Sequence, residues 1–312
     1  LGSRGLGDVY KRQLMTLEEA IAKIKPLDHN AMEIAQKRWD SIAKPLHSLG
    51  KLETLLIQIA GITGNAEVDL SRRGLIAMCA DNGVVEEGVT QTGQEVTAIV
   101  AENFLKYDTS VGVMCKQNHA EIFPVDMGMV TDTKVRTDHK IAYGTQNMTK
   151  GPAMTREQAV KGLEAGIDMV RELNDKGYRI LATGEMGIGN TTTSSAVASV
   201  LLKQPVEEMT GRGAGLSDEG LHRKIHAIER GIAVNHPNAA DPLGVLAALG
   251  GFDVAGLCGV FLGGALEKIP VIMDGFISGV AALCAVRLCP AAAKAVFASH
   301  ASSEPAARLV LN

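Results

Sequence analysis

The sequence predicts an α/β fold in which a doubly wound parallel sheet is flanked by helices. Short apolar runs alternate with longer segments of helical periodicity, and this order is typical of strand–helix–strand units. The runs are continuously apolar, as expected for strands buried on both faces of a parallel sheet. Each is followed by an acid and a glycine at the edge where open parallel sheets bind ligands. The four runs are residues 74–80, 120–125, 179–183 and 269–273.

Composition and charge argue against several classes of function. Of the 312 residues, 46% are hydrophobic, so a large core is available. The net charge of −4 and the absence of a basic stripe argue against a nucleic-acid partner. The apolar segments 254–266 and 275–286 are shorter than the ~20 residues of a bilayer span, so we expect buried helices and no membrane partner. Five cysteines without a Cys-x-x-Cys pair favour the reducing cytoplasm.

The chain divides into three parts. Residues 1–14 lack an apolar core and any periodicity, so we interpret them as a leader or non-native remnant and not a secretory signal. Residues 15–70 are predicted to form a small helical subdomain or arm, in which Pro26 and Pro45 separate the helices. Residues 71–312 are predicted to form the α/β domain, apparently truncated at its C-terminus.

Helix boundaries are predicted from capping residues. Thr16 with Glu19, and Thr155 with Gln158, have the spacing of capping boxes. Gly177 follows the second of these helices and is expected to take the left-handed conformation that ends it. The acids that follow the second and fourth runs, Asp126 and Asp274, are interpreted as N-caps.

The segment 184–196 is the most informative in the chain. It has the sequence Gly-Glu-Met-Gly-Ile-Gly-Asn-Thr-Thr-Thr-Ser-Ser-Ala, which indicates a strand running into a glycine-rich turn that opens a helix. Unpaired amides and the helix dipole make such a turn an anion site. Glu185 lies inside it, and an acid beside an anion site suggests a function. The alternative is a tight turn that binds nothing.

The same segment almost matches a nucleotide-binding P-loop. Gly184, Gly189 and Thr191 fit the pattern, but Asn190 stands where the P-loop has its lysine. The missing lysine argues against hydrolysis of a nucleoside triphosphate. It favours a ligand that carries one phosphate.

A second glycine-rich loop, residues 211–215, precedes a helix with Ser217 as its expected cap. Arg212, Arg223 and Lys224 make this region the best cationic complement to a phosphate. A solvated helix face explains Arg223 and Lys224 equally well by composition.

Six motifs occur together and in order, and through them the chain resembles the nicotinate-nucleotide–dimethylbenzimidazole phosphoribosyltransferases from about Met15 to Arg308. The resemblance implies a Rossmann-like parallel sheet, a homodimer, and no metal or other cofactor. It implies displacement of nicotinate from nicotinate mononucleotide by 5,6-dimethylbenzimidazole, giving α-ribazole 5′-phosphate for the lower ligand of cobalamin. The motifs are Ala80-Asp81-Asn82-Gly83-Val84, Gln94-Glu95-Val96-Thr97, residues 184–192, residues 211–215 with Asp241-Pro242-Leu243-Gly244, and Asp274-Gly275-Phe276.

The resemblance also implies roles for individual residues. Glu185 corresponds to the catalytic glutamate, and Thr90 and Gln94 to part of the benzimidazole pocket. His300 and Glu304 lie in a further family segment near the nucleotide. The nucleotide- and phosphate-binding residues implied are Gly187, Ile188, Gly189, Asn190, Gly211, Arg212, Gly213, Lys224 and Ser302.

Two departures from the family pattern leave alternatives open. Asn82 stands where relatives often have histidine, and the sequence stops before a Gly-Glu-Gly-Thr-Gly segment that carries the family's proposed general base. We therefore expect this chain to bind the nucleotide but to turn over poorly. A non-catalytic nucleotide-binding protein and a P-loop-like kinase or NTPase remain the alternatives. No metal site is expected, because His222 and His226 form a lone pair.

Overall fold

Five parallel strands form one sheet in the order β2-β1-β3-β4-β5 in the computed structural model, which describes residues 15–312. The predicted leader lies outside the described residues. The chain leaves β1 toward β2 on one side and later enters β3 on the other, so the strand order reverses between β1 and β3. This is the switch point at which doubly wound sheets bind ligands. The strands are β1 (Arg73–Ala80), β2 (Ala120–Gly128), β3 (Ile180–Met186), β4 (Val271–Met273) and β5 (Val296–Ala298).

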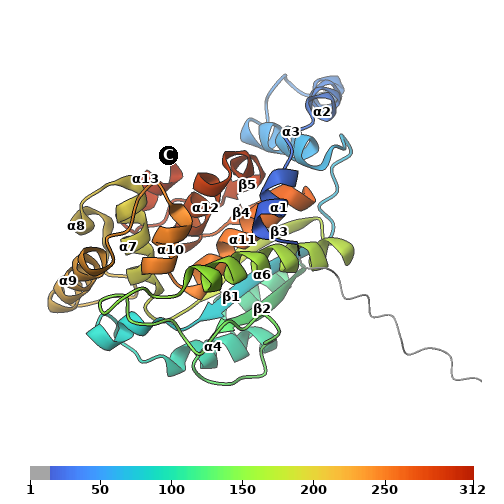
Figure 1. Cartoon of the computed structure of the whole chain (residues 1–312). Helices are drawn as coiled ribbons and strands as arrows, with labels where there is room; N and C mark the ends of the chain where they lie inside the picture. Colours follow the sequence, from blue (N-terminus) through green and yellow to red (C-terminus); the bar gives the residue numbers. More distant parts are fainter. Residues whose placement is uncertain (1–14) are drawn as a thin grey trace, which may run out of the picture.

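Strand β1 has both faces covered, which confirms the predicted fold class. Ile76 and Met78 point into the main core, where α11 packs, whereas Leu75 and Cys79 join a second apolar cluster beneath α4 and α5. Figure 1 shows α4 and α6 on opposite sides of the strands. The helices that cover the sheet are α4 (Glu95–Lys106), α5 (Ser110–Gln117), α6 (Arg156–Asp175) and α11 (Phe252–Glu267).

Helix α11 is almost entirely buried between the sheet and α6. Its close approach to α6 requires glycine, because a Cβ on Gly259 would lie 1.9 Å from the carbonyl oxygen of Leu163. The two apolar segments near the C-terminal end are thus buried helices, α11 and α12 (Phe276–Leu288), as the sequence indicates. Within residues 15–312, no helix has both the length and the hydrophobicity needed to cross a membrane.

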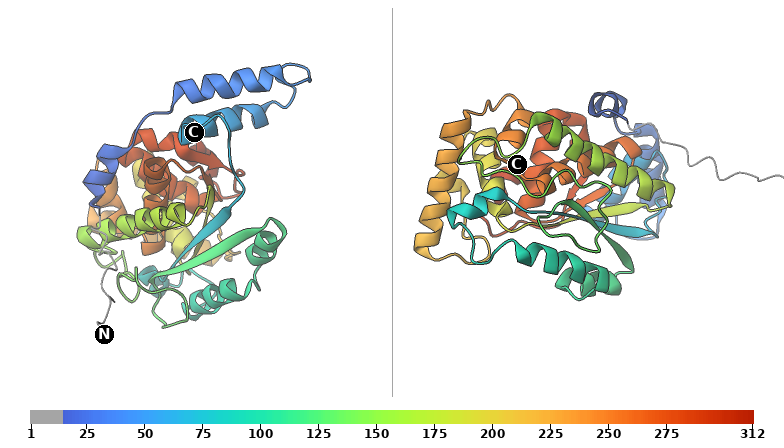
Figure 2. Two further views of the ribbon diagram at one scale, coloured as in Figure 1. Left: turned by 90° about the vertical axis from the view of Figure 1, so that its right-hand side faces the viewer. Right: turned by 60° about the horizontal axis from the view of Figure 1, so that its bottom comes forward.

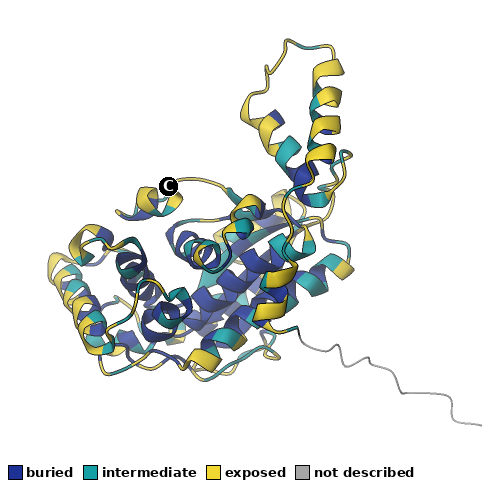
Figure 3. Ribbon diagram, turned by 45° about the horizontal axis from the view of Figure 1, so that its top comes forward, coloured by how far each residue is buried: buried dark blue, intermediate teal, exposed yellow. Residues whose placement is uncertain are grey.

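The first helices stand apart from the sheet. Helix α1 packs on α6 and α11, and the backbone N–H of Leu17 donates to Glu164 Oε1 at 3.2 Å. Helices α2 and α3 project from the rest of the molecule (Figures 1 and 2), and much of this projection is exposed (Figure 3). The division at residues 15–70 and 71–312 stays a prediction. The bounds are α1 (Leu17–Lys23), α2 (His29–Ser41) and α3 (Lys51–Thr63).

The remaining elements surround the carboxyl ends of the strands or complete the C-terminal part. Helix α7 begins directly after the turn that follows β3, and α9 packs against it. They are η1 (Gly83–Glu87), α7 (Asn190–Leu202), α8 (Val206–Met209), α9 (Asp218–Asn235), α10 (Pro242–Leu249), η2 (Pro290–Ala295) and α13 (Ala307–Leu311).

The predicted helix caps are mostly confirmed. Thr16 and Thr155 form complete capping boxes with Glu19 and Gln158. Gly177 takes a left-handed φ of +87° just beyond the last helical turn of α6. Ser217 caps α9 through the backbone N–H of Gly220.

Two predicted caps are wrong. Asp126 lies within β2, and its carboxylate accepts the backbone N–H groups of Gly128 and Met129 where the strand ends. Asp274 precedes the cap position of α12, which Gly275 occupies without a side-chain hydrogen bond. Neither acid caps a helix, because Asp126 lies inside its strand and Asp274 lies one residue before the cap position.

The strand boundaries also differ from the prediction. Strand β3 continues through Glu185 to Met186, so Gly184 and Glu185 belong to the strand and not to the turn. The sequence analysis does not predict strand β5, which forms the edge of the sheet beside β4.

Candidate functional site

The candidate site lies where the loops after β1, β3 and β4 meet the glycine-rich loop 211–215. Gln91 donates a hydrogen bond to the carbonyl of Gly215, and the backbone N–H of Gly213 donates to Glu304 Oε1 at 3.1 Å. These contacts join segments that are distant in sequence. A cavity of about 120 Å³ lies beside the second contact, lined by Glu185, Thr191, Asp274, Gly275, Phe276, Ile277, Ser278, Ser302 and Glu304.

Close packing around the turn after β3 requires its glycines. A Cβ on Gly187 would lie 2.5 Å from the carbonyl oxygen of Ala80, and one on Gly189 would lie 2.9 Å from Val85. Gly189 also has a left-handed φ of +94°. The backbone N–H of Ile188 donates to Thr97 Oγ1 at 3.1 Å. The protein itself therefore demands a tight turn here, whether or not a ligand is bound.

Glu185 is one of three acidic residues that line the cavity, together with Asp274 and Glu304. Its Oε2 accepts a hydrogen bond from Asn190 Nδ2, whereas its Oε1 accepts none from residues 15–312. Burial, together with the charges of Asp253 and Asp274, raises the pKa of Glu185 to about 8, and the Asn190 hydrogen bond opposes the shift. A half-buried carboxyl with a pKa near neutrality suits a group that changes charge during catalysis.

Asp253 is a second buried carboxylate beside Glu185, and the sequence reasoning missed it. It lies in the first turn of α11 and is fully buried. Its Oδ2 accepts from the same Asn190 amide at 2.9 Å, and its Oδ1 accepts the backbone N–H of Val254 at 2.9 Å. Burial raises the pKa of Asp253 to about 7. In sequence, it resembles any acid that opens an apolar helix.

Lys224 is the cation of the site, and it is fully buried. Its Nζ donates to Thr191 Oγ1 at 2.9 Å and to the carbonyl of Gly211 at 3.0 Å. Burial lowers the pKa of Lys224 to about 8, and the nearby charge of Glu304 opposes this shift. Because Thr191 also lines the cavity, Lys224 stands directly behind its wall.

The two arginines of this region are engaged elsewhere. Arg212 donates to the carbonyl of Leu216 at 2.8 Å and pairs with Asp218. Arg223 donates to the carbonyl of Gly88 at 3.1 Å. Of the three cations that the sequence singles out, only Lys224 is directed toward the cavity wall.

Glu304 and Ser302 come from the loop before α13. Glu304 Oε1 occupies the Gly213 amide, and its Oε2 is buried without a hydrogen-bond partner among the described residues. The backbone N–H of Glu304 donates to Ser302 Oγ at 3.3 Å, and both side chains line the cavity. His300 instead contacts the neighbouring Ser299 hydroxyl at 2.9 Å.

Thr90 and Gln94 lie on the β1 side and do not line the cavity. Thr90 Oγ1 donates to the carbonyl of Thr92 at 2.9 Å. Gln94 Nε2 donates to the carbonyl of Asn82 at 3.1 Å, and Asn82 Nδ2 in turn donates to the carbonyl of Ile188 at 3.3 Å. Gln94 therefore reaches the turn through Asn82, which stands where relatives often have histidine.

The structure brings together most of the predicted residues. Glu185 and Ser302 line the cavity, Asn190 holds Glu185, and Lys224 links the loop 211–213 to Thr191. Sequence reasoning noted Asp274-Gly275-Phe276 as a motif without giving it a role in the site, and it missed the lining residues Ile277 and Ser278, which look like ordinary residues at the start of an apolar helix.

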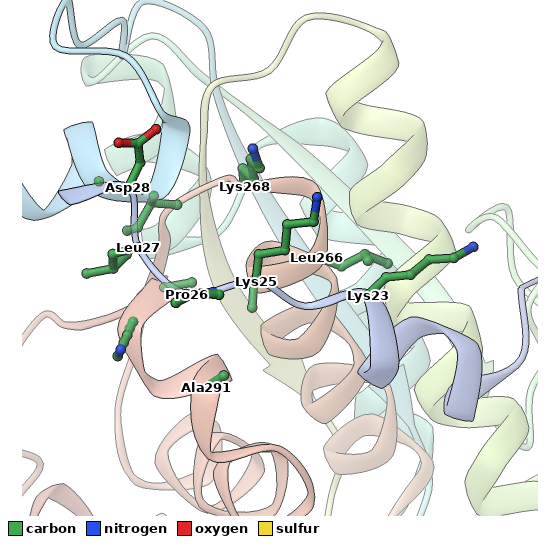
Figure 4. Close-up of a pocket in the computed structure, with 13 residues that line it drawn as sticks. Lys23, Lys25, Pro26, Leu27, Asp28, Leu266, Lys268 and Ala291 are labelled. Carbon is green, nitrogen blue, oxygen red and sulfur yellow. The ribbon is translucent and has the colours of Figure 1, made fainter. Parts of the chain in front are cut away.

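A larger cavity of about 540 Å³ shares no residue with the candidate site. It lies between the linker after α1 and the end of α11, and several lysines surround an apolar floor. Lys23 extends in a different direction from Lys25 and Lys268 (Figure 4), so these ammonium groups do not converge on one point. We assign it no chemistry.

No group of three or more metal-ligating side chains is placed to hold an ion anywhere in residues 15–312. His226 pairs with Glu229 at 3.3 Å on the exposed face of α9. The expectation that the reaction uses no metal stays a prediction.

Known proteins match nearly the whole chain. A family profile described as phosphoribosyltransferase matches residues 24–312. The nicotinate-nucleotide–dimethylbenzimidazole phosphoribosyltransferase of Ruminiclostridium cellulolyticum is 49% identical over 299 residues, which cover 95% of this chain and 85% of the relative. The protein of the same name from Clostridium acetobutylicum is 48% identical with the same coverage. The crystal structure of CobT from Thermus thermophilus superimposes with a TM-score of 0.85 at 36% identity, covering 90% of this chain and 85% of that one.

Proposed function

The chain belongs to the nicotinate-nucleotide–dimethylbenzimidazole phosphoribosyltransferase family, and we propose that it transfers phosphoribose from nicotinate mononucleotide to 5,6-dimethylbenzimidazole. The products are nicotinate and α-ribazole 5′-phosphate, the precursor of the lower ligand of cobalamin. The enzyme class is that of the pentosyl-transferring glycosyltransferases.

One observation carries this proposal: the small cavity is lined by carboxylates, Glu185 among them, and has a buried cation behind the wall that Thr191 forms. Glu185 and Thr191 both line it, and Lys224 donates to Thr191. Nicotinate mononucleotide has the complementary charges, with a phosphate at one end of the ribose and a pyridinium cation at the other. Lys224 and the loop 211–213 would take the phosphate, and Glu185 would face the sugar carbon.

The chemistry needs few protein groups. The bond from the ribose C1′ to the nicotinate nitrogen breaks, and the neutral ring leaves with the electron pair. One benzimidazole nitrogen donates its electron pair to C1′, and the proton of the other nitrogen passes to a carboxylate or to water. Ionised Glu185 stabilises the positive charge that develops on the sugar. Holding both rings in line across C1′ supplies much of the rate.

The phosphate position requires Glu304 to move or to be protonated, because its carboxylate now occupies the Gly213 amide. Thr90 and Gln94 stay proposals for the benzimidazole side. Gly187, Ile188 and Gly189 are likewise proposed to bind the nucleotide, since their backbone lies between the end of β3 and the start of α7.

A homodimer is also part of the proposal, together with a cytoplasmic location. Large apolar side chains are exposed on the projecting α2–α3 segment, among them Leu46 at 66% and Leu52 at 51%. Exposed apolar surface of this kind supports association with a second copy. Light scattering of the purified protein would give twice the mass of the chain if this proposal holds.

The test is direct. The protein is incubated with nicotinate mononucleotide and dimethylbenzimidazole, and nicotinate release and α-ribazole phosphate formation are followed by chromatography and mass spectrometry. A second arm repeats the assay with the chain extended by the residues of the Ruminiclostridium cellulolyticum relative that the match leaves out, since it covers 85% of that relative. Product in either arm supports the proposal. Tight nucleotide binding without product in both arms would identify a non-catalytic nucleotide-binding protein, and competition by ATP would indicate an NTPase-like site.

A further inference from the structure

We propose that Asp253 is a positioning residue for Glu185, acting through the side-chain amide of Asn190, an inference that rests on the proposed function of Glu185. The three side chains come from three elements: Glu185 from β3, Asn190 from the first position of α7 and Asp253 from the first turn of α11. Asn190 Nδ2 donates to both carboxylates. Its orientation is therefore set by two acceptors at once.

The Asp253 carboxylate lies against two glycines. A Cβ on Gly187 would lie 2.7 Å from Asp253 Oδ2, and one on Gly251 would lie 2.3 Å from Asp253 Oδ1. A side chain at either position would therefore displace the carboxylate from where it meets Asn190. Gly187 belongs to the turn of the candidate site, so the packing of α11 and the shape of that turn depend on each other.

The consequence for Glu185 is geometric. Asn190 donates a hydrogen bond to Glu185 Oε2, whereas Glu185 Oε1 accepts none from the described part of the chain. Glu185 also lines the cavity. If Asn190 were free to rotate, Oε2 would lose its partner. Asp253 keeps the amide in place and so leaves Oε1 as the oxygen that meets the substrate.

A second consequence is electrostatic. The buried Asp253 carboxylate and the half-buried Glu185 carboxylate share one amide and repel each other, and this repulsion adds to the effect of burial in raising the pKa of Glu185. The charge of Asp274, beyond β4, acts on Glu185 in the same sense, and the charge of Asp81, beyond β1, acts on Asp253. Cys79 on β1 lies near both carboxylates, and their charges add to burial in raising its pKa.

No cation in the described part of the chain contributes to the pKa shift of Glu185, and only the Asn190 hydrogen bond lowers it. The arrangement differs at the end of β2, where Lys140 pairs with Asp126 at 3.1 Å. A buried acid placed so close to another acid is costly for folding. Such a loss of folding free energy is expected where the charge of one acid sets the pKa of a reacting group, here Glu185.

The test compares the wild type with Asp253→Asn, which keeps the shape and removes the charge. The acid limb of kcat/KM reports the ionisation of Glu185 and should move to lower pH by roughly one unit, as expected when a neighbouring like charge is removed. In a Glu185→Gln background, Asp253→Asn should produce no such shift. The matched control is Asp126→Asn, a buried acid at the end of β2 that should lower stability and leave the acid limb in place.

A readout without turnover separates this inference from the proposed function. Infrared difference spectra of the carboxyl band, compared with Glu185→Gln, give the titration of Glu185 in both the wild type and Asp253→Asn. A lower titration midpoint in Asp253→Asn supports the inference even if the assay gives no product. An unchanged midpoint, or an equal shift in Asp126→Asn, would overturn it.

Discussion

Glu304 places one carboxylate oxygen 3.1 Å from the backbone nitrogen of Gly213, in the glycine-rich loop beside the buried Lys224. The carboxylate thus occupies an amide that the proposed function gives to a phosphate. Two anions cannot share that amide, since each would repel the other at short distance. The nucleotide therefore has to displace or neutralise Glu304.

We predict that Glu304→Gln binds nicotinate mononucleotide more tightly than the wild type, on the order of tenfold, because a repelling charge is removed. Calorimetric titration measures the dissociation constant. Nicotinate riboside, which lacks the phosphate, is the matched ligand and should bind both proteins alike. Weaker binding of the nucleotide by Glu304→Gln would show that this carboxylate assists the phosphate site.

Lys224→Met is expected to raise the stability of the protein and to weaken its recognition of the phosphate. The folded-state pKa of about 8 lies below the usual value for lysine, so the unfolded state binds more protons between the two values. The wild type should therefore gain stability as the pH rises from about 8 toward 10.5. Removal of the buried charge should stabilise the protein near pH 7 by on the order of 1–3 kcal/mol.

Denaturant unfolding at several pH values checks the Lys224 prediction, and the pH dependence should disappear in Lys224→Met. The same variant should lose the preference for nicotinate mononucleotide over its riboside. A destabilised variant that still distinguishes the two ligands would mean that Lys224 supports the fold and not the phosphate site.

Gly187→Ala tests how tightly the turn after β3 is packed. The new methyl would lie 2.5 Å from the Ala80 carbonyl oxygen, so a loss of about 2 kcal/mol or more is expected. Gly151→Ala is the matched control, because a Cβ there meets nothing within 4 Å. Its effect should stay within about 0.5 kcal/mol. Equal melting temperatures for the two variants would show that the turn can relax.

Parts of the fold that depend on local pattern are predictable. Continuous apolar runs identify β1 to β4, and the spacing of Thr155 and Gln158 locates the start of α6. The anion-binding character predicted for the turn after β3 follows from its glycines and its place between strand and helix. These features reside in neighbouring residues, so a single sequence displays them.

Long-range features are not predictable from the residues themselves. Asp253 shares the Asn190 amide with Glu185 only because α11 begins beside the turn after β3, and its sequence context is that of a common helix start. Likewise, the loop carrying Glu304 reaches Gly213 only in the folded chain. The sequence suggests that the glycines at 187 and 189 make room for a ligand, whereas their neighbours in the fold already require them.

The central claim is that Glu185 acts on the reacting sugar carbon, and Glu185→Gln tests it most directly. Nicotinate release and the dissociation constant of nicotinate mononucleotide are measured in parallel for the variant and the parent. We predict that kcat falls by about 10²-fold or more, while the dissociation constant changes by less than about threefold. Equal losses in turnover and binding would contradict the claim and make Glu185 a binding residue only.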